Sequence, residues 1–175
     1  MDRKDNQSPQ GETARILVEF LEVAITSIVF LKGIYPPGAF ERRKYMNLVV
    51  HSARHPELRD YIHSAVSGLH PFIQKSYGSR VEEADLEFSL RSFFIKLPFS
   101  ESLTRVLPQD CRWEITAYFR SLPQASTSKE AELWIPTDTQ QWQQPPLITP
   151  IKSMSSEPLS VQLYLEHPGL SEPKA

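Results

Sequence analysis

The fold is decided by residues 14–31, which read ARILVEFLEVAITSIVFL. Thirteen of these 18 residues are apolar, and the polar positions 15, 19, 22 and 26 fall within about 60° of one another on a helical wheel. The pattern predicts a helix with one thin polar stripe, and a helix this apolar is expected to lie in the middle of the fold. Glu19 and Glu22 interrupt the apolar run, which argues against a membrane span and against a signal peptide.

The composition is that of one ordinary globular domain. Of the 175 residues, 40% are hydrophobic and 23% are charged, and the formal net charge is −2. This balance gives no general electrostatic attraction to nucleic acid, which would need a basic face. The single cysteine, Cys111, excludes an internal disulfide and a cysteine-built zinc site, and it indicates a reducing compartment, either cytosol or nucleus.

Polar residues precede the first helix and a turn follows it. The helix is expected to begin either at Ser8-Pro9 or at Thr13, and the sequence leaves both open. It is expected to end at Lys32-Gly33, because a cation suits the last turn of a helix and a glycine suits the position after it. The YPPG motif that follows predicts a turn.

Two further helices are predicted, over residues 56–74 and 80–97. The first begins with proline at its first position and carries an acid in its first turn. Its apolar side chains follow a 3.6-residue period: Leu58, Tyr61, Ile62, Ala65, Val66, Leu69, Phe72 and Ile73. Ser79 and Glu82 have the spacing of a capping box that opens the second, and Pro98 ends it.

Strands are predicted on either side of these two helices. Residues 39–51 predict a hairpin or its remnant, and the basic cluster at 41–44 is interpreted as a solvated turn in preference to a nuclear signal or a phosphate contact. Residues 111–119 alternate as a half-buried strand, with these side chains on the buried face: Cys111, Trp113, Ile115, Ala117 and Phe119. Residues 159–166 alternate in the same way, with Gln162 and Tyr164 on the outer face.

No pattern of catalytic chemistry stands out. The histidines are His51, His55, His63, His70 and His167, and none belongs to an HExxH motif or lies beside ligand-spaced carboxylates. The six glycines form no phosphate-binding loop, and no GxSxG elbow occurs. Cys111, on the buried face of its predicted strand, is expected to be a small buried hydrophobe rather than a nucleophile. The sequence therefore predicts no catalytic residue, no metal ligand and no cofactor, and it favours a binding module.

Several collinear segments resemble a HORMA domain, and most of residues 13–166 take part. They are FLEVA at 20–24, IYPPGAF at 34–40, HPEL at 55–58, PIKSMSS at 150–156 and VQLYLE at 161–166. Within that superfamily they are most similar to the accessory subunits of translesion DNA polymerase zeta, which are relatives of the mitotic-arrest-deficient spindle checkpoint protein.

The resemblance implies an α+β, HORMA-like fold, in which three helices pack on an antiparallel sheet that is truncated here. It divides the chain into a polar tail (1–12), a core (13–122), a segment like the family's safety belt (123–168) and a second tail (169–175). In this family the safety belt closes over an extended partner peptide. The resemblance therefore implies a non-catalytic adaptor that supports translesion DNA synthesis in the nucleus, with the cytoplasm as a further location, and without direct contacts to nucleic acid or membrane.

Residues that match the family's motifs carry the expected partner contacts. Tyr35, Tyr61 and Trp134 would bind a peptide of the catalytic subunit of DNA polymerase zeta, although Tyr61 also fits plain core packing. A second set would bind the deoxycytidyl-transferase scaffold polymerase: Leu147, Gln162 and Tyr164. For Gln162 and Tyr164, an ordinary solvent-facing strand is the alternative. Arg91 would mediate self-association, as a HORMA homodimer or heterodimer.

The chain departs from the family in one place. In HORMA domains a β-hairpin of two sheet strands separates the second helix from the third, whereas here residues 74–79, QKSYGS, lead directly into the third helix. Without that hairpin the strand at 111–119 is expected to have an unpaired edge. The alternatives to the translesion adaptor are therefore a spindle-checkpoint or meiotic HORMA adaptor, and an isoform that functions poorly because it lacks sheet strands.

Overall fold

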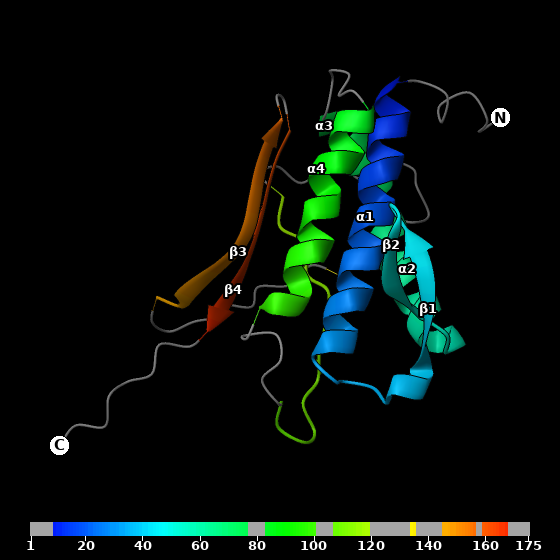
Figure 1. Ribbon diagram of the computed structural model, residues 1–175, viewed down its shortest axis with the longest axis vertical. Coiled ribbons are helices and arrows are strands. Elements are labelled where there is room, and N and C mark those ends of the chain that lie inside the picture. Colours follow the sequence, from blue (N-terminus) through cyan, green and yellow to red (C-terminus); the bar gives the residue numbers. More distant parts are fainter. Residues whose placement is uncertain are drawn as a thin grey trace.

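The computed structural model describes residues 9–76, 83–100, 107–119, 134–135, 145–156 and 159–167. Helices and antiparallel hairpins alternate along the chain (Figure 1). In order they are α1 (Pro9–Leu31), β1 (Phe40–Tyr45), β2 (Leu48–Ala53), α2 (Pro56–Ser67), α3 (His70–Ser76), α4 (Glu83–Lys96), β3 (Leu147–Ser156) and β4 (Leu159–His167). Two short 3-10 helices complete the set, η2 (Pro37–Ala39) and η3 (Leu97–Phe99).

Helix α1 lies in the middle of the molecule, as its apolar pattern predicts, and contacts α2, α3, α4 and β2 (Figure 1). It begins at Pro9, which decides between the two starting points that the sequence left open. It ends before Gly33, whose φ of +64° is a conformation that glycine adopts without a steric penalty. One hydrophobic cluster joins α1 to α4 and the β3–β4 hairpin, and a second joins it to the β1–β2 hairpin and α2.

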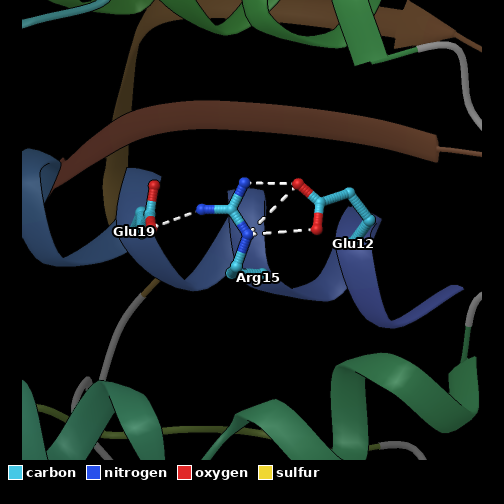
Figure 2. Close-up of polar contacts among 3 residues, drawn as sticks. All are labelled: Glu12, Arg15 and Glu19. Atoms are coloured by element: carbon cyan, nitrogen blue, oxygen red, sulfur yellow. Dashed lines mark hydrogen bonds and ion pairs between the residues drawn. The ribbon is translucent and has the colours of Figure 1, made fainter. Parts of the chain in front are cut away.

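The predicted polar stripe of α1 pairs mostly within the helix, except that the Glu22 carboxylate lies 3.0 Å from Nδ1 of His63 on α2. Figure 2 shows the Arg15 guanidinium between the carboxylates of Glu12 and Glu19, one turn away on either side. The hydrogen bond from Arg15 holds the pKa of Glu12 below its usual range. Further along the stripe, the Thr26 hydroxyl donates to the Glu22 carbonyl at 2.7 Å, so its buried oxygen is satisfied within the helix.

Strands β1 and β2 form the predicted hairpin, with Phe40 opposite Ala53 and Tyr45 opposite Leu48. Met46 and Asn47 connect them with φ values of 49° and 59°, the positive pair that a tight two-residue turn of type I′ requires. The basic cluster therefore lies on β1 and not in a turn, which corrects the interpretation drawn from the sequence.

The single helix predicted over residues 56–74 is wrong, because the structure has two helices there. Helix α2 ends at Ser67, and α3 begins at His70. Pro71 has no backbone N–H to donate to the Ser67 carbonyl, so the helical ladder cannot continue through this point. The Leu69 N–H instead bonds to the Val66 carbonyl at 3.0 Å, the spacing of a tighter 3-10 turn.

Helix α4 carries the predicted apolar stripe and ends at Lys96, just before Pro98. Its side chains at 86, 90 and 93 have no exposed surface. The predicted capping box from Ser79 to Glu82 lies outside the described residues.

The predicted strand at 111–119 is wrong, since these residues pair with no strand in the part of the chain that the structure describes. The segment is not in a ladder because a β-strand needs a partner for its backbone groups. Of the side chains predicted to be buried, only those in the middle of the segment are partly buried. Cys111, expected to be buried, is exposed, and so is Phe119.

The C-terminal strands β3 and β4 form a hairpin that packs through β3 against α4 (Figure 1). Strand β4 alternates as predicted, with Leu159 buried and Gln162 and Tyr164 exposed. The register shifts between Pro150 and Lys152, which points Ile151 into the same cluster as Leu159. The architecture is α+β, as expected.

His51 on β2 makes stability depend on pH. Its ring stacks on Phe30 with centroids 3.6 Å apart, and burial together with the nearby Arg42 holds the pKa of His51 below its usual range. The unfolded chain therefore binds more protons below about pH 6.5, and the free energy of unfolding falls as the pH drops through that value. We expect the His51→Gln variant to lose part of this fall between about pH 7.5 and 5.5 in urea denaturation. The same change at exposed His55 is the control, and an unchanged slope in His51→Gln would contradict the prediction.

Candidate peptide-binding groove

A groove of about 540 Å³ lies where the turn after α1 meets the start of α2. Its lining is mostly apolar and rich in aromatic and proline residues, and we call it the aromatic groove. It is lined by Tyr35, Pro36, Gly38, Ala39, His55, Glu57, Leu58, Tyr61 and Trp113.

Trp113 connects the two tyrosines that line this groove. Its Nε1 donates a hydrogen bond to the Tyr35 hydroxyl at 3.1 Å. Its ring meets Tyr61 edge-on, with centroids 5.4 Å apart and planes at 83°, and it meets Tyr35 in the same manner at 6.4 Å. Both tyrosines remain exposed, Tyr35 by 36% and Tyr61 by 45%. The three rings thus contact one another and still offer surface to a ligand.

Tyr61 lies on a helix and Tyr35 lies in a turn. Tyr61 stands on α2, and its neighbours Leu58 and Ile62 are buried in the core beneath it. Tyr35 lies in the turn between α1 and η2. The Ala39 carbonyl, at the end of η2, accepts a hydrogen bond from the Arg54 N–H at 2.7 Å, so the groove side formed by η2 is tied to the residue that follows β2.

Residues 111–119 run from the groove along α2 and α3. Trp113 contacts Tyr61 on α2, and Phe119 contacts Phe72 on α3 with ring centroids 5.0 Å apart. The segment has no ladder partner among the described residues, and through Trp113 it lies beside the aromatic groove.

The structure brings together two of the three residues predicted for peptide binding. Tyr35 and Tyr61 meet through Trp113, whereas Trp134 is half-buried and is not among the residues that line the groove. Sequence reasoning missed Trp113 as a site residue, because alternation placed it on the buried face of a strand. The signal that could have identified it is the presence of a tryptophan, Trp113, near the start of that segment.

The residues predicted to contact a scaffold polymerase lie on the β3–β4 hairpin. Gln162 and Tyr164 share its exposed face, where the cross-strand partner of Tyr164 is Pro150. Leu147 is exposed but pairs with His167, so it belongs to the opposite face. Ile148, which is 60% exposed, is the aliphatic residue on the face of Tyr164.

Arg91, predicted to mediate self-association, lies half-buried on α4. Its Nε is buried without a hydrogen-bond partner in the described part of the chain. Exposed apolar side chains on the same helix, Phe88 and Ile95, leave an open surface nearby.

The described ranges hold neither a cluster of metal-ligating side chains nor a helix able to span a membrane. No three His, Cys, Asp or Glu side chains within them are grouped to hold an ion. Each helix described is too short or too polar to cross a bilayer.

Known proteins resemble this chain over nearly its whole length. It is 60% identical over 203 residues to the DNA polymerase zeta processivity subunit of Arabidopsis thaliana, which covers 99% of this chain and 94% of that protein. It is 26% identical over 189 residues to the human mitotic spindle assembly checkpoint protein MAD2B, over 87% of this chain and 90% of that protein. No protein-family model matches the sequence.

The fold also has a solved counterpart. A chain in the crystal structure of a mitotic checkpoint complex superposes with a TM-score of 0.72 and 17% identity, covering 93% of this chain and 98% of that one. An identity this low shows the fold alone, and it confirms the expected HORMA-like fold.

The alignment lengths show that this chain is shorter than its relatives. The match to the Arabidopsis protein spans 203 residues, more than the 175 of this chain, so the relative carries residues without a counterpart here. We expect the missing residues to be those of the β-hairpin that separates the second and third helices in HORMA domains.

Proposed function

The chain belongs to the HORMA family, as a non-catalytic member related to the polymerase zeta processivity subunit and to MAD2B, and from this membership we propose that it is an adaptor that traps an extended peptide. The peptide would come from the catalytic subunit of DNA polymerase zeta, and the complex would act in translesion DNA synthesis in the nucleus. The observation that carries the proposal is the convergence of Tyr35, Tyr61 and Trp113 beside an extended segment without a strand partner in the described chain.

The physical mechanism combines two kinds of contact. The peptide backbone would pair with residues 111–119, which have no strand partner among the described residues. An apolar or proline side chain of the peptide fills the aromatic groove, where the fixed rings lose little conformational entropy on binding. The belt segment, residues 123–168, then closes over the peptide and brings Trp134 to it.

Two further surfaces complete the proposed adaptor. The exposed face of the β3–β4 hairpin, with Gln162 and Tyr164, would bind the scaffold polymerase, and Leu147 would contribute from the hairpin's end. Arg91 and the open face of α4 would mediate association with a second HORMA protein. Each partner would have its own surface on the chain. A mutation at one surface should therefore leave the other two contacts intact.

Co-purification tests the central step. A tagged peptide from the polymerase zeta catalytic subunit is expected to retain the full chain, and Trp134→Ala is expected to weaken that retention because the belt loses an aromatic contact. The control is Gln162→Ala, on the exposed face of the β3–β4 hairpin. It should leave retention of the peptide unchanged.

A thermal melt followed by circular dichroism decides how a negative result is interpreted. A chain that melts cooperatively but retains no peptide would contradict peptide capture. A chain without a cooperative transition would favour the poorly functional isoform over both adaptor functions.

A further inference from the structure

Gly38 lines the aromatic groove from η2, the short 3-10 helix that follows the turn after α1. The Ala39 N–H donates a hydrogen bond to the Pro36 carbonyl at 2.9 Å, so the chain turns across Pro37 and Gly38. Gly38 is exposed within this turn. On this side the groove is therefore bordered by a hydrogen-bonded turn to which Gly38 contributes backbone only.

The fold does not require glycine at position 38. The φ of Gly38 lies outside the left-handed region, whereas Gly33, in the turn after α1, has a φ of +64° that strains any other residue. Packing does not require it either. Its chain neighbours aside, no heavy atom of the described residues lies within 4 Å of the place where a Cβ would stand. A larger residue would therefore fit at position 38 without strain in the free chain.

The lining of the aromatic groove is small at η2 and bulky elsewhere. Seven of its nine lining residues carry larger side chains, among them the rings of Tyr35, Tyr61 and Trp113. The other two are Gly38, without a side chain, and Ala39, with a single methyl group. A ligand can therefore approach the backbone of η2 closely while it contacts the rings, and close approach of a ligand to the backbone is a common use of glycine.

We propose that Gly38 determines specificity, because the absence of a side chain at this position leaves room in the aromatic groove for a bulky apolar side chain of the bound peptide. The inference rests on the proposed capture of an extended peptide. The groove volume of about 540 Å³ lies within the usual range of ligand pockets, about 300–1,000 Å³. A side chain at position 38 would occupy part of that volume and would compete with the side chain of the peptide.

Substitutions of increasing size at position 38 test the inference. Fluorescence anisotropy of the full chain gives the dissociation constant for a labelled peptide from the polymerase zeta catalytic subunit. We expect Gly38→Ala to raise this constant about two- to fivefold and Gly38→Val to raise it at least tenfold. Gly38→Thr adds a side chain of nearly the same shape as valine and should cause the same loss. Ser153→Val, at an exposed position of β3 outside the groove, is the control and should change the constant less than about twofold.

The melting temperature of the free chain separates this effect from damage to the fold. Gly38→Ala should raise the melting temperature by about 1–4 °C, because alanine reduces the freedom of the unfolded chain and fits the native backbone. Gly33→Ala should lower it, because the φ of +64° disfavours alanine. A variant that is more stable and yet binds the peptide more weakly cannot have lost affinity through unfolding.

An NMR readout shows where the added side chain lies. The methyl groups introduced by Gly38→Val should give nuclear Overhauser contacts to the rings of Tyr61 or Trp113 in the free chain. Their absence would mean that the side chain points away from the groove, which would overturn the inference.

The other outcomes are also decisive. Equal affinities of the wild type and Gly38→Val would overturn the role of Gly38 while peptide capture stands. A loss in Gly38→Val without a loss in Gly38→Thr would mean that polarity and not size governs binding, and a lowered melting temperature in Gly38→Ala would mean that the fold requires the glycine. A wild-type chain that does not bind the peptide would overturn the proposed function, and this inference with it.

Discussion

Replacing Trp113 by alanine is expected to abolish retention of the extended peptide while the chain still folds. The Trp113 ring packs edge-on against Tyr61 and Tyr35 and holds the Tyr35 hydroxyl through Nε1. Its removal takes away the middle one of the three contacting rings and frees both tyrosines, whose rings are partly exposed already. Aromatic anchors of this kind contribute about 2 kcal/mol or more, so the dissociation constant should rise about 30-fold or more.

Two variants make this prediction specific. Trp113→Phe keeps the ring contacts but loses the hydrogen bond to Tyr35, so we expect a smaller loss, about three- to tenfold. Tyr118→Ala removes an aromatic ring that is 71% exposed and outside the groove. Because only the backbone of this segment is proposed to pair with the peptide, the substitution should change the affinity far less than Trp113→Ala. Equal losses in Trp113→Ala and Tyr118→Ala would show that the whole segment, rather than the groove, governs capture.

The helices could be predicted because their patterns are local. Residues 14–31 are apolar nearly all round, and α1 contacts three other helices and β2 as that pattern requires. The hairpin at 40–53 and the alternating strand β4 also follow from short-range patterns. The break at Pro71 was also a local signal, which the regular spacing of apolar side chains across it concealed.

The segment at 111–119 could not be predicted from its own alternation. Alternating side chains make a strand only when another strand satisfies the backbone, and this requirement is set by residues elsewhere in the chain. The described residues supply no such partner, so the segment packs on α2 and α3 through Trp113 and Phe119 instead. Because the segment packs on the helices and not in a sheet, Trp113 lies in the groove and Cys111 is exposed.

The second large effect is expected in the core, where Phe93→Ala should lower the free energy of unfolding by about 3–5 kcal/mol. Phe93 has no exposed surface and meets Phe20 of α1 edge-on, with ring centroids 5.6 Å apart. Urea denaturation gives the measurement, with Phe88→Ala as the matched control on the same helix. Phe88 is 76% exposed, so its removal should cost less than about 0.5 kcal/mol.

The same substitution tests what holds the C-terminal hairpin in place. Phe93 belongs to the cluster that contains Ile151 of β3 and Leu159 of β4, and β3 packs on α4 (Figure 1). A cavity at Phe93 should therefore release the hairpin before the rest of the chain unfolds, and amide hydrogen exchange in β4 should accelerate more than exchange in β2. Equal acceleration in both strands would mean that the hairpin and the core unfold as one unit. Undiminished protection of β4 would mean that contacts other than those with α4 hold the hairpin, which would contradict the prediction.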